Sequence, residues 1–265
     1  MYRNFFKRCL DFLLALFSCL VLALPLLIIA LFVRFNLGSP VIFKQPRPGI
    51  KDKDGIETVF VMYKFRTMTD KRDENGNLLP DEQRLTPFGK TLRSLSLDEL
   101  PEIFNILKGD MSVVGPRPLL VRDMAFMTPA LRERHRVRPG LTGLAQVNGR
   151  NDLPWDQKLD TDLRYIEHIS FLSDLKIILR TFKKVFIREG IAEDAEAGVS
   201  MDYGDYLLLN GRVDRETYDT LQQLSRSLIA ARGTREMPAL YRELNAVRLQ
   251  KEPTAFEKSP NSPAD

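Results

Sequence analysis

The longest apolar stretch of the chain lies near its N-terminus. Phe12 to Val33 comprises 22 residues without a charged side chain. At about 1.5 Å per residue, a straight helix of that length just crosses a hydrocarbon core of about 30 Å. Pro25 lies in the middle of the stretch, where it removes a backbone donor and clashes with the preceding turn. The stretch is therefore compatible with a straight span or with a re-entrant helix whose arms are Phe12–Leu24 and Pro25–Phe35.

Basic side chains flank this stretch on both sides, whereas the positive-inside tendency favours one membrane face. They are Arg3, Lys7 and Arg8 before it, and Arg34, Lys44 and Arg47 after it. A straight span would place one of these clusters on the disfavoured face, and a re-entrant helix would place both on the cytoplasmic face. The residues alone leave both arrangements open.

Beyond the apolar stretch, the pattern changes to short runs rich in β-branched and aromatic residues. Pro40–Lys44 and Thr58–Phe65 are two such runs, and the turn sequence Lys51–Gly55 separates them. This arrangement predicts a β-hairpin over residues 41–65. Asp70–Leu85 is polar and is expected to form a surface loop.

Thr86–Leu107 has apolar residues at steps of three and four, which predicts helical structure. Pro101 interrupts the pattern, so two helices are expected, with Leu97-Asp98-Glu99 at the start of the second. Gly109 is suited to the C-terminal stop of that second helix. Residues 115–118, Gly-Pro-Arg-Pro, cannot form regular structure.

The second half of the chain contains further helical patterns. Helices are predicted over Asp156–Ile169, Tyr218–Ala231 and Pro238–Leu249. Phe171–Ile191 combines an apolar stripe with five Lys and Arg residues, so it is expected to pack on a core or to lie in the plane of an anionic bilayer. The last stretch, Glu252–Asp265, has no apolar periodicity and is predicted to be disordered.

Composition and charge restrict the class of protein. A chain of 265 residues that is 44% hydrophobic, with a mean hydropathy of −0.20, is neither a multi-span membrane protein nor a disordered chain. Residues 1–191 have a net charge of +8 and residues 192–265 a net charge of −4. The only cysteines, Cys9 and Cys19, exclude a disulfide framework, and His135 and His168 have no ligand-like spacing. A basic, membrane-attached body with an acidic C-terminal piece is expected.

Candidate chemistry centres on the adjacent carboxylates of Asp98 and Glu99. They lie between Leu97 and Leu100, which indicates a partly buried boundary, and near a predicted helix start. A set of basic residues next to Gly, Pro or other motif positions can present cations to phosphate oxygens. These residues are Lys64, Arg66, Arg93, Arg117, Arg138 and Arg150. A carboxylate among such cations can attack phosphorus or hold Mg²⁺.

Four segments together resemble the bacterial sugar transferases, the monotopic phosphoglycosyl transferases. They are KFRTM (64–68), SLDELP (96–101), NILKGDMSVVGPRP (105–118) and RPGLTGLAQVNGR (138–150). The resemblance extends from about residue 3 to residue 190 and does not cover residues 192–265. It implies transfer of a sugar-1-phosphate from a UDP-sugar to undecaprenyl phosphate, with release of UMP.

The resemblance also implies roles for individual residues. Asp98 would be the nucleophile that forms a covalent phosphosugar adduct, with Glu99 beside it and Mg²⁺ as the cofactor. Lys64, Arg93, Arg117, Arg150 and Asp174 match functionally important charged positions of the family. Pro25 matches the proline that breaks the family's re-entrant helix, although Leu24 stands where the family has serine.

Together these features predict an α+β protein. It would be a mostly helical small catalytic domain with a short β-hairpin, a re-entrant N-terminal membrane helix and interfacial amphipathic helices. The expected divisions are a membrane helix (1–36), a catalytic domain (37–191), a helical extension (192–251) and a tail (252–265). The catalytic domain would lie on the cytoplasmic face of the cytoplasmic membrane. The expected partners are a UDP-sugar, polyprenyl phosphate, the membrane and a second copy of the chain, but no nucleic acid.

Two other functions fit the same residues. A membrane-anchored binding or assembly protein could use the arginines to grip anionic lipid without catalysis. A membrane-tethered glycosyltransferase would transfer only the sugar and release UDP in place of UMP.

Overall fold

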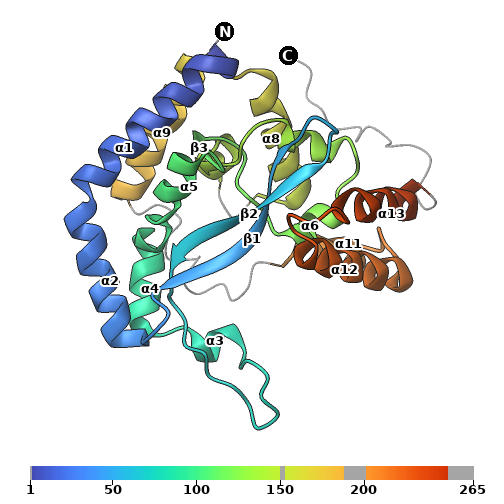
Figure 1. Ribbon diagram of the computed structural model, residues 1–265, viewed down its shortest axis with the longest axis horizontal. Helices are drawn as coiled ribbons and strands as arrows, with labels where there is room; N and C mark the ends of the chain where they lie inside the picture. Colours follow the sequence, from blue (N-terminus) through green and yellow to red (C-terminus); the bar gives the residue numbers. More distant parts are fainter. Residues whose placement is uncertain (1, 150–152, 188–200, 250–265) are drawn as a thin grey trace.

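A β-hairpin runs through the middle of the molecule, between two groups of helices (Figure 1). The computed structural model describes residues 2–149, 153–187 and 201–249. On one side of the hairpin lie α1 (Lys7–Val21) and α2 (Ala23–Leu37), preceded by the π-helical turn η1 (Tyr2–Phe6). On the other side lie the C-terminal helices α11 (Tyr203–Leu209), α12 (Arg215–Ala230) and α13 (Met237–Leu249).

The hairpin consists of β1 (Ile42–Lys51) and β2 (Glu57–Phe65) in antiparallel register, which confirms the prediction for residues 41–65. β1 contains Pro46 and Pro48, which have no N–H to donate, and β2 is its one partner strand within the described ranges. The outer edge of β2 is satisfied by the side chain of Asn105. Asn105 accepts from the Tyr63 amide at 3.0 Å and donates to the Val61 carbonyl at 2.7 Å.

The apolar N-terminal stretch forms two helices that meet at an angle of 65°. No single helix among the described residues is long and apolar enough to cross a membrane, and α1 and α2 meet that criterion only as a pair. The break falls at Leu22, three residues before Pro25, which lies in the first turn of α2. The proline ring excludes the carbonyl of the residue four positions earlier, so the distortion precedes it. The bend is therefore present, but the predicted arms Phe12–Leu24 and Pro25–Phe35 were placed about one turn too late.

The central part of the chain is built from short elements joined by loops. They are α3 (Asp81–Arg84), α4 (Pro87–Ser94), η2 (Leu97–Glu99), α5 (Glu102–Lys108), β3 (Ser112–Val114), α6 (Val121–Ala125), η3 (Leu131–Arg136), β4 (Gly140–Thr142), α7 (Leu144–Asn148), α8 (Trp155–Glu167) and α9 (Phe171–Ile187). The predicted helices over 86–107, 156–169 and 171–191 correspond to α4, α5, α8 and the described part of α9. The motif 138–150 contributes β4, which pairs in parallel with β3, and α7, which follows it.

The C-terminal helices pack on the rest of the molecule and share its largest apolar cluster. That cluster combines Val121 to Met127, around α6, with side chains of α11, α12 and α13 such as Leu224 and Leu244. The two helices predicted in this region are confirmed, and α11 is an additional helix that the sequence pattern did not reveal. The predicted boundary near residue 191 and the predicted disordered tail, 252–265, lie outside the described residues.

Candidate functional site

The acidic pair Asp98 and Glu99 lies in η2, a single 3₁₀ turn between α4 and α5. The predicted position at the start of the second helix is wrong by one turn, because Pro101 occupies the N-cap of α5 and separates the pair from it. Ser96, immediately before η2, has φ of 54° and is the one non-glycine residue with positive φ in the described part of the chain. The backbone of the acidic turn is thus entered through a conformation that L-residues rarely adopt.

Glu99 is held by two cations. Its Oε1 lies 2.7 Å from Lys64 Nζ, at the end of β2, and 2.9 Å from Arg117 Nη2 in the Gly-Pro-Arg-Pro loop. Burial alone would raise the pKa of Glu99, but Arg117 and Lys64 outweigh it and hold the pKa far below its ordinary value. Glu99 is therefore ionised, and it fixes the positions of both cations.

Asp98 differs from its neighbour, because no hydrogen bond or ion pair joins its carboxylate to another described side chain. Its residue surface is 9% exposed. Burial raises the pKa of Asp98 to about 6, against the attraction of Lys64, and the charge of Glu99 adds to the rise. A buried carboxylate that is ionised at neutral pH and has no bonded partner in the described part of the chain is suited to nucleophilic attack.

A third carboxylate, that of Glu102, completes the cluster. It is 3% exposed, and its Oε1 lies 3.3 Å from Lys64 Nζ. Burial raises the pKa of Glu102 to about 7, against the opposing charge of Lys64. Sequence reasoning missed Glu102, although its position at the start of α5, one turn after Asp98, was visible in the sequence.

Arg117 is presented by a loop that two close backbone approaches fix in place. A Cβ on Gly115 would lie 2.5 Å from the Arg138 carbonyl, and one on Gly140 would lie 2.1 Å from the Gly115 amide nitrogen. Both positions therefore require glycine. Gly115 belongs to the motif 105–118 and Gly140 to the motif 138–150, and the two motifs contact each other here. The Arg117 side chain is 47% exposed, so its guanidinium faces both Glu99 and solvent.

Arg93 and Arg66 extend from the neighbouring segments in different ways. Arg93 Nε donates to Thr67 Oγ1 at 3.1 Å, and the Arg93 charge lies close enough to lower the pKa of Asp98. Arg66 is 8% exposed and donates to the carbonyls of Ser39 and Met68 at 2.9 Å. The structure therefore places Arg93 beside the acidic pair, whereas the guanidinium of Arg66 is used within the fold.

Three other residues expected at the site lie elsewhere or are not described. Arg138 Nε donates to the Gly109 carbonyl at 2.7 Å, at the far end of α5. Asp174 accepts from the Tyr2 and Tyr165 hydroxyls, both at 2.8 Å, and from Lys7 Nζ at 2.5 Å. It thereby ties the N-terminus of the chain to α8 and α9. Arg150 lies outside the described residues.

Arg47, expected among the basic residues that flank the membrane stretch, lies instead beside the site. Its Nη1 donates to the Pro118 carbonyl at 3.1 Å, and its Nη2 donates to Gln45 Oε1 at 2.6 Å. Its Nε is buried and has no hydrogen-bond partner among the residues that the structure describes. Burial lowers the pKa of Arg47 to about 10, and the like charge of Arg117 contributes to the fall.

The atoms of Asp98 and Glu99 that could bind a metal ion are carboxylate oxygens. Within the described ranges, no group of three or more His, Cys, Asp or Glu side chains is arranged to enclose a metal ion. The Asp98 carboxylate has no bonded partner there, and the contacts of Glu99 involve only Oε1. One or two carboxylates that share an ion with substrate phosphates are the usual protein contribution to a Mg²⁺ site, and this pair fits that description.

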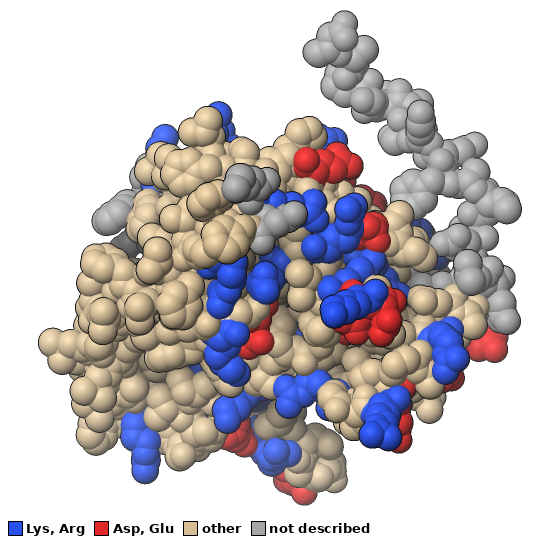
Figure 2. All heavy atoms as spheres, turned by 45° about the horizontal axis from the view of Figure 1, so that its top comes forward, with Lys and Arg blue, Asp and Glu red and all other residues tan. Residues whose placement is uncertain are grey.

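A broad apolar surface lies next to the site. One side of the molecule, where α1 and α2 lie in Figure 1, is almost free of charged side chains, whereas Lys and Arg gather over the middle (Figure 2). Exposed apolar side chains of α1 and α2 include Phe17, Leu20 and Phe35, and α9 adds Leu172 and Phe182. An exposed apolar surface of this extent indicates contact with a membrane or a partner.

Comparison with known proteins agrees with this arrangement. The profile of the family described as bacterial sugar transferase matches residues 2–188. The chain is 49% identical over 187 residues to the "Uncharacterized sugar transferase EpsL" of Bacillus subtilis (strain 168), which covers 71% of this chain and 90% of that protein. It is 35% identical over 201 residues to the "Exopolysaccharide production protein ExoY" of Rhizobium meliloti (strain 1021), covering 69% and 87%.

A longer relative has a more specific name. The "UDP-glucose:undecaprenyl-phosphate glucose-1-phosphate transferase" of Klebsiella pneumoniae is 39% identical over 194 residues, covering 69% of this chain and 41% of that protein. The helices α11 to α13 lie beyond the residues that the family profile matches.

Proposed function

Because this chain belongs to the bacterial sugar transferase family and is a sugar-1-phosphate transferase, we propose that it transfers a sugar-1-phosphate from a UDP-sugar to undecaprenyl phosphate. UMP is the other product. The observation that carries the proposal is the contrast within the acidic pair: Glu99 is held by Lys64 and Arg117, whereas Asp98 is buried and has no bonded partner among the described side chains.

The reaction proceeds in two displacements at one phosphorus. An Asp98 carboxylate oxygen attacks the phosphorus that carries the sugar, the bond from that phosphorus to the bridging oxygen breaks, and UMP leaves with the electron pair. A phosphate oxygen of undecaprenyl phosphate then attacks the same phosphorus. The Asp98–phosphorus bond breaks, which releases the lipid-linked sugar diphosphate and restores the carboxylate.

The cations around Asp98 bind and orient the phosphates. Arg117 offers a half-exposed guanidinium, whose planar fork matches phosphate oxygens. Lys64 contributes a second positive charge, which Glu99 and Glu102 hold in place. Positive charge fixed before the reaction stabilises the charge that develops on the phosphoryl oxygens.

Asp98 and Glu99 would hold Mg²⁺ together with the donor diphosphate. Their oxygen donors suit this ion, as described above. When bound, the ion supplies further positive charge to the diphosphate. The side chains of Lys64, Arg93 and Arg117 would orient the same diphosphate.

We propose that the bent helix pair holds the site at the membrane surface. Both ends of the pair dock on the same domain: Lys7 and Tyr2 on Asp174, and Val33 and Leu37 beside Phe65 and Leu92. Because a rigid domain lies on one face of a membrane, the pair is proposed to enter and leave by that face. The exposed apolar side chains of α1, α2 and α9 would face the lipid, where undecaprenyl phosphate is found.

The catalytic proposal is tested by Asp98→Asn in the full chain, purified with its membrane anchor. Turnover and the ³²P-labelled phosphosugar adduct are both expected to be lost, by roughly 10³-fold or more, because the amide cannot attack phosphorus. Asp81→Asn, which changes an exposed carboxylate that pairs with Arg84, is the matched control and should retain activity. Full turnover in Asp98→Asn would overturn the nucleophile assignment.

The product distinguishes this reaction from sugar transfer alone. A panel of UDP-sugars is incubated with undecaprenyl phosphate, and the nucleotide released is identified by chromatography. UMP is expected, whereas UDP would identify a tethered glycosyltransferase. The sugar that gives the highest rate identifies the donor.

The topology is tested by single cysteines in a chain from which Cys9 and Cys19 have been replaced. Arg3 precedes the bent pair, in η1, and Lys53 follows it, in the turn between β1 and β2; each is replaced by cysteine. A membrane-impermeant thiol reagent is expected to label both from the cytoplasmic side. Labelling from opposite sides would show that the pair spans the membrane.

A further inference from the structure

The C-terminal helices are joined to the rest of the molecule by polar contacts as well as by an apolar core. At the end of the hairpin, the Tyr241 hydroxyl of α13 donates to the Glu57 carbonyl at 3.2 Å. Asn245 Oδ1, one turn later, accepts from Arg132 Nη1 at 2.8 Å. Arg132 also lies over the Tyr241 ring, 5.1 Å from its centroid. Two residues of α13 thus hold one arginine of η3.

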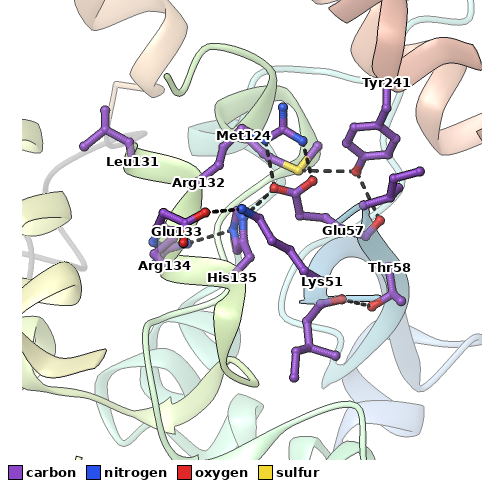
Figure 3. Close-up of polar contacts among 12 residues, drawn as sticks. Lys51, Glu57, Thr58, Met124, Leu131, Arg132, Glu133, Arg134, His135 and Tyr241 are labelled. Atoms are coloured by element: carbon purple, nitrogen blue, oxygen red, sulfur yellow. Dashed lines mark hydrogen bonds and ion pairs between the residues drawn. The ribbon is translucent and has the colours of Figure 1, made fainter. Parts of the chain in front are cut away.

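That arginine belongs to a buried cluster at the start of β2 (Figure 3). Arg132 Nε donates to Glu57 Oε1 at 2.8 Å, and its Nη2 donates to Glu57 Oε2. His135 Nδ1 lies 3.3 Å from the same Oε1. Glu57 is fully buried, and every oxygen of its carboxylate is engaged. The cluster therefore fixes η3 on one side to β2 and on the other to α13.

The contacts continue from this cluster to the active-site loop. His135 Nε2 lies 3.4 Å from Arg134 Nη1, and a neutral ring that donates through Nδ1 to Glu57 can accept there. Arg134 is 2% exposed and pairs with Asp162 of α8 at 2.6 Å. Its Nη2 also donates to the backbone carbonyl of Arg117 at 2.7 Å.

We infer that the C-terminal helices help to position the active-site arginine, Arg117, through α13, Arg132, Glu57, His135 and Arg134. Arg134 is the positioning residue that touches the loop. The inference rests on the proposed function, since it assumes that Arg117 binds the donor diphosphate. It assigns a catalytic contribution to a part of the chain that the family profile does not cover.

The physical reason lies in the weakness of η3 by itself. A 3₁₀ segment of six residues has poor hydrogen-bond geometry, so the side chains that it anchors decide its orientation. Three of its side chains, Arg132, Arg134 and His135, are buried. If Arg132 loses its hydrogen bond to Asn245 and its contact with Tyr241, η3 is no longer held by α13. Arg134 can then move together with the Arg117 carbonyl that it binds.

The first test is hydrogen exchange in the full-length protein in nanodiscs. Asn245→Ala is expected to increase the exchange rate of the four non-proline amides in residues 115–120 by roughly three- to tenfold, since loss of a hydrogen bond to a charged group weakens local structure. Leu228→Val, which removes a buried methylene group from the same apolar cluster and leaves the contacts of Arg132 intact, is the matched control. It should lower the melting temperature and leave the exchange of residues 115–120 unchanged relative to the rest of the domain. Unchanged loop exchange in Asn245→Ala would overturn the inference.

The second test is a double-mutant cycle on kcat/KM, measured as UMP release from the most active UDP-sugar of the panel. Asn245→Ala and Tyr241→Phe are each expected to lower kcat/KM by roughly two- to fivefold, as loss of one hydrogen bond permits. In the Arg117→Ala background the same changes should have little further effect. Equal losses in both backgrounds would mean that α13 acts on folding alone, and would overturn the inference.

Different results would overturn the proposed role of Arg117 and the inference about the C-terminal helices. If Arg117→Ala keeps full kcat/KM, the assignment of Arg117 to the diphosphate is wrong, and the inference fails with it. If Arg117→Ala is impaired but Asn245→Ala and Tyr241→Phe affect neither loop exchange nor kcat/KM, only the inference is overturned. Because these two substitutions bury no unpaired charge, both variants are expected to fold.

Discussion

Glu57 and Asp98 are both buried carboxylates close to arginines, and their ionisation is displaced in opposite directions. Burial opposes the ionisation of Glu57, but hydrogen bonds from His135 and Arg132 outweigh burial and lower the pKa of Glu57 to about 2. For Asp98, burial dominates over Lys64 and raises the pKa to about 6. The difference lies in partners rather than in depth: both oxygens of Glu57 are bonded, whereas Asp98 has no bond to another described residue.

The contrast separates a carboxylate that maintains structure from one that is available to react. Bonds that satisfy a buried charge also occupy the oxygens that would attack a substrate. At the proposed active site, the bonds from Lys64 and Arg117 are concentrated on Glu99, so the Asp98 carboxylate is left without a bond to another described side chain. Active sites commonly carry such a local cost in stability.

The largest expected effect comes from breaking the saturated cluster. Glu57→Gln removes the charge opposite Arg132 and should lower the free energy of unfolding by about 3–5 kcal/mol, because it leaves a buried guanidinium without its counter-charge. Urea unfolding of the full chain in micelles measures the loss. Glu133→Gln, on a half-exposed carboxylate paired with Lys51, is the control and should change stability by less than about 0.5 kcal/mol. A loss below about 1 kcal/mol for Glu57→Gln would contradict the structural role.

The pH dependence of stability should report the same cluster. Burial lowers the pKa of His135 to about 4, so between pH 6.5 and 4 the unfolded chain takes up a proton that the folded chain does not. Stability should therefore fall as the pH is lowered through that window, by about 3 kcal/mol in total. Melting curves at several pH values measure this slope. His135→Gln should flatten it, and His168→Gln, at an exposed site, should not.

Asp98→Asn should have the opposite sign to Glu57→Gln. A carboxylate whose pKa is raised in the folded state costs stability once it is ionised, so the neutral amide should stabilise the metal-free protein at pH 7 by about 1–2 kcal/mol. The gain should disappear below about pH 4, where Asp98 is protonated in both states. Thermal unfolding in the presence of a chelator measures the difference. Destabilisation at pH 7 would show that Asp98 has a stabilising partner and would remove the contrast with Glu57.

The smallest effect concerns the backbone next to Asp98. Ser96 has a positive φ, and glycine adopts that conformation without the clash of Cβ, so Ser96→Gly should stabilise the fold by about 1 kcal/mol. Ser94→Gly, two residues earlier in the last turn of α4, should instead destabilise by about 0.5–1 kcal/mol. If both changes destabilise equally, Ser96 stores no strain.

Local patterns were sufficient to predict much of the fold. The helical structure predicted from Thr86 onward begins there: Thr86 caps α4 by accepting from the Gly89 amide at 3.0 Å, and Pro87 follows it in the first helical turn. Gly109, with φ of 93°, ends α5 in the left-handed conformation. The acidic pair and its proximity to Lys64, Arg93 and Arg117 were also expected. Each of these features depends on residues a few positions apart or on a motif with a fixed order.

The features that sequence reasoning missed depend on distant contacts. Arg47 reaches the Pro118 carbonyl across 71 positions, and Arg132 meets Glu57 across 75. In the sequence, residues 132–138 contain four arginines and one acid, Glu133, whereas in the fold acids from β2 and α8 neutralise two of the arginines. The bend in the apolar N-terminal stretch was predicted, but its position was not, because a proline distorts the turn before it. Arg66 was expected to bind substrate because of its neighbours, and the fold uses its guanidinium for backbone carbonyls.

The shared apolar core has a consequence for the order in which the protein is made. Val121 and Met124 of α6 pack against Leu228 and Leu244, so the family domain cannot close its largest core until more than a hundred further residues have been synthesised. At roughly 5–20 residues per second, α6 would wait for several seconds with its apolar face uncovered. The bent N-terminal pair would reach the membrane during that time. We therefore expect translation to deliver an anchored but unfinished enzyme, which folds to completion on the membrane surface only after its last helices emerge.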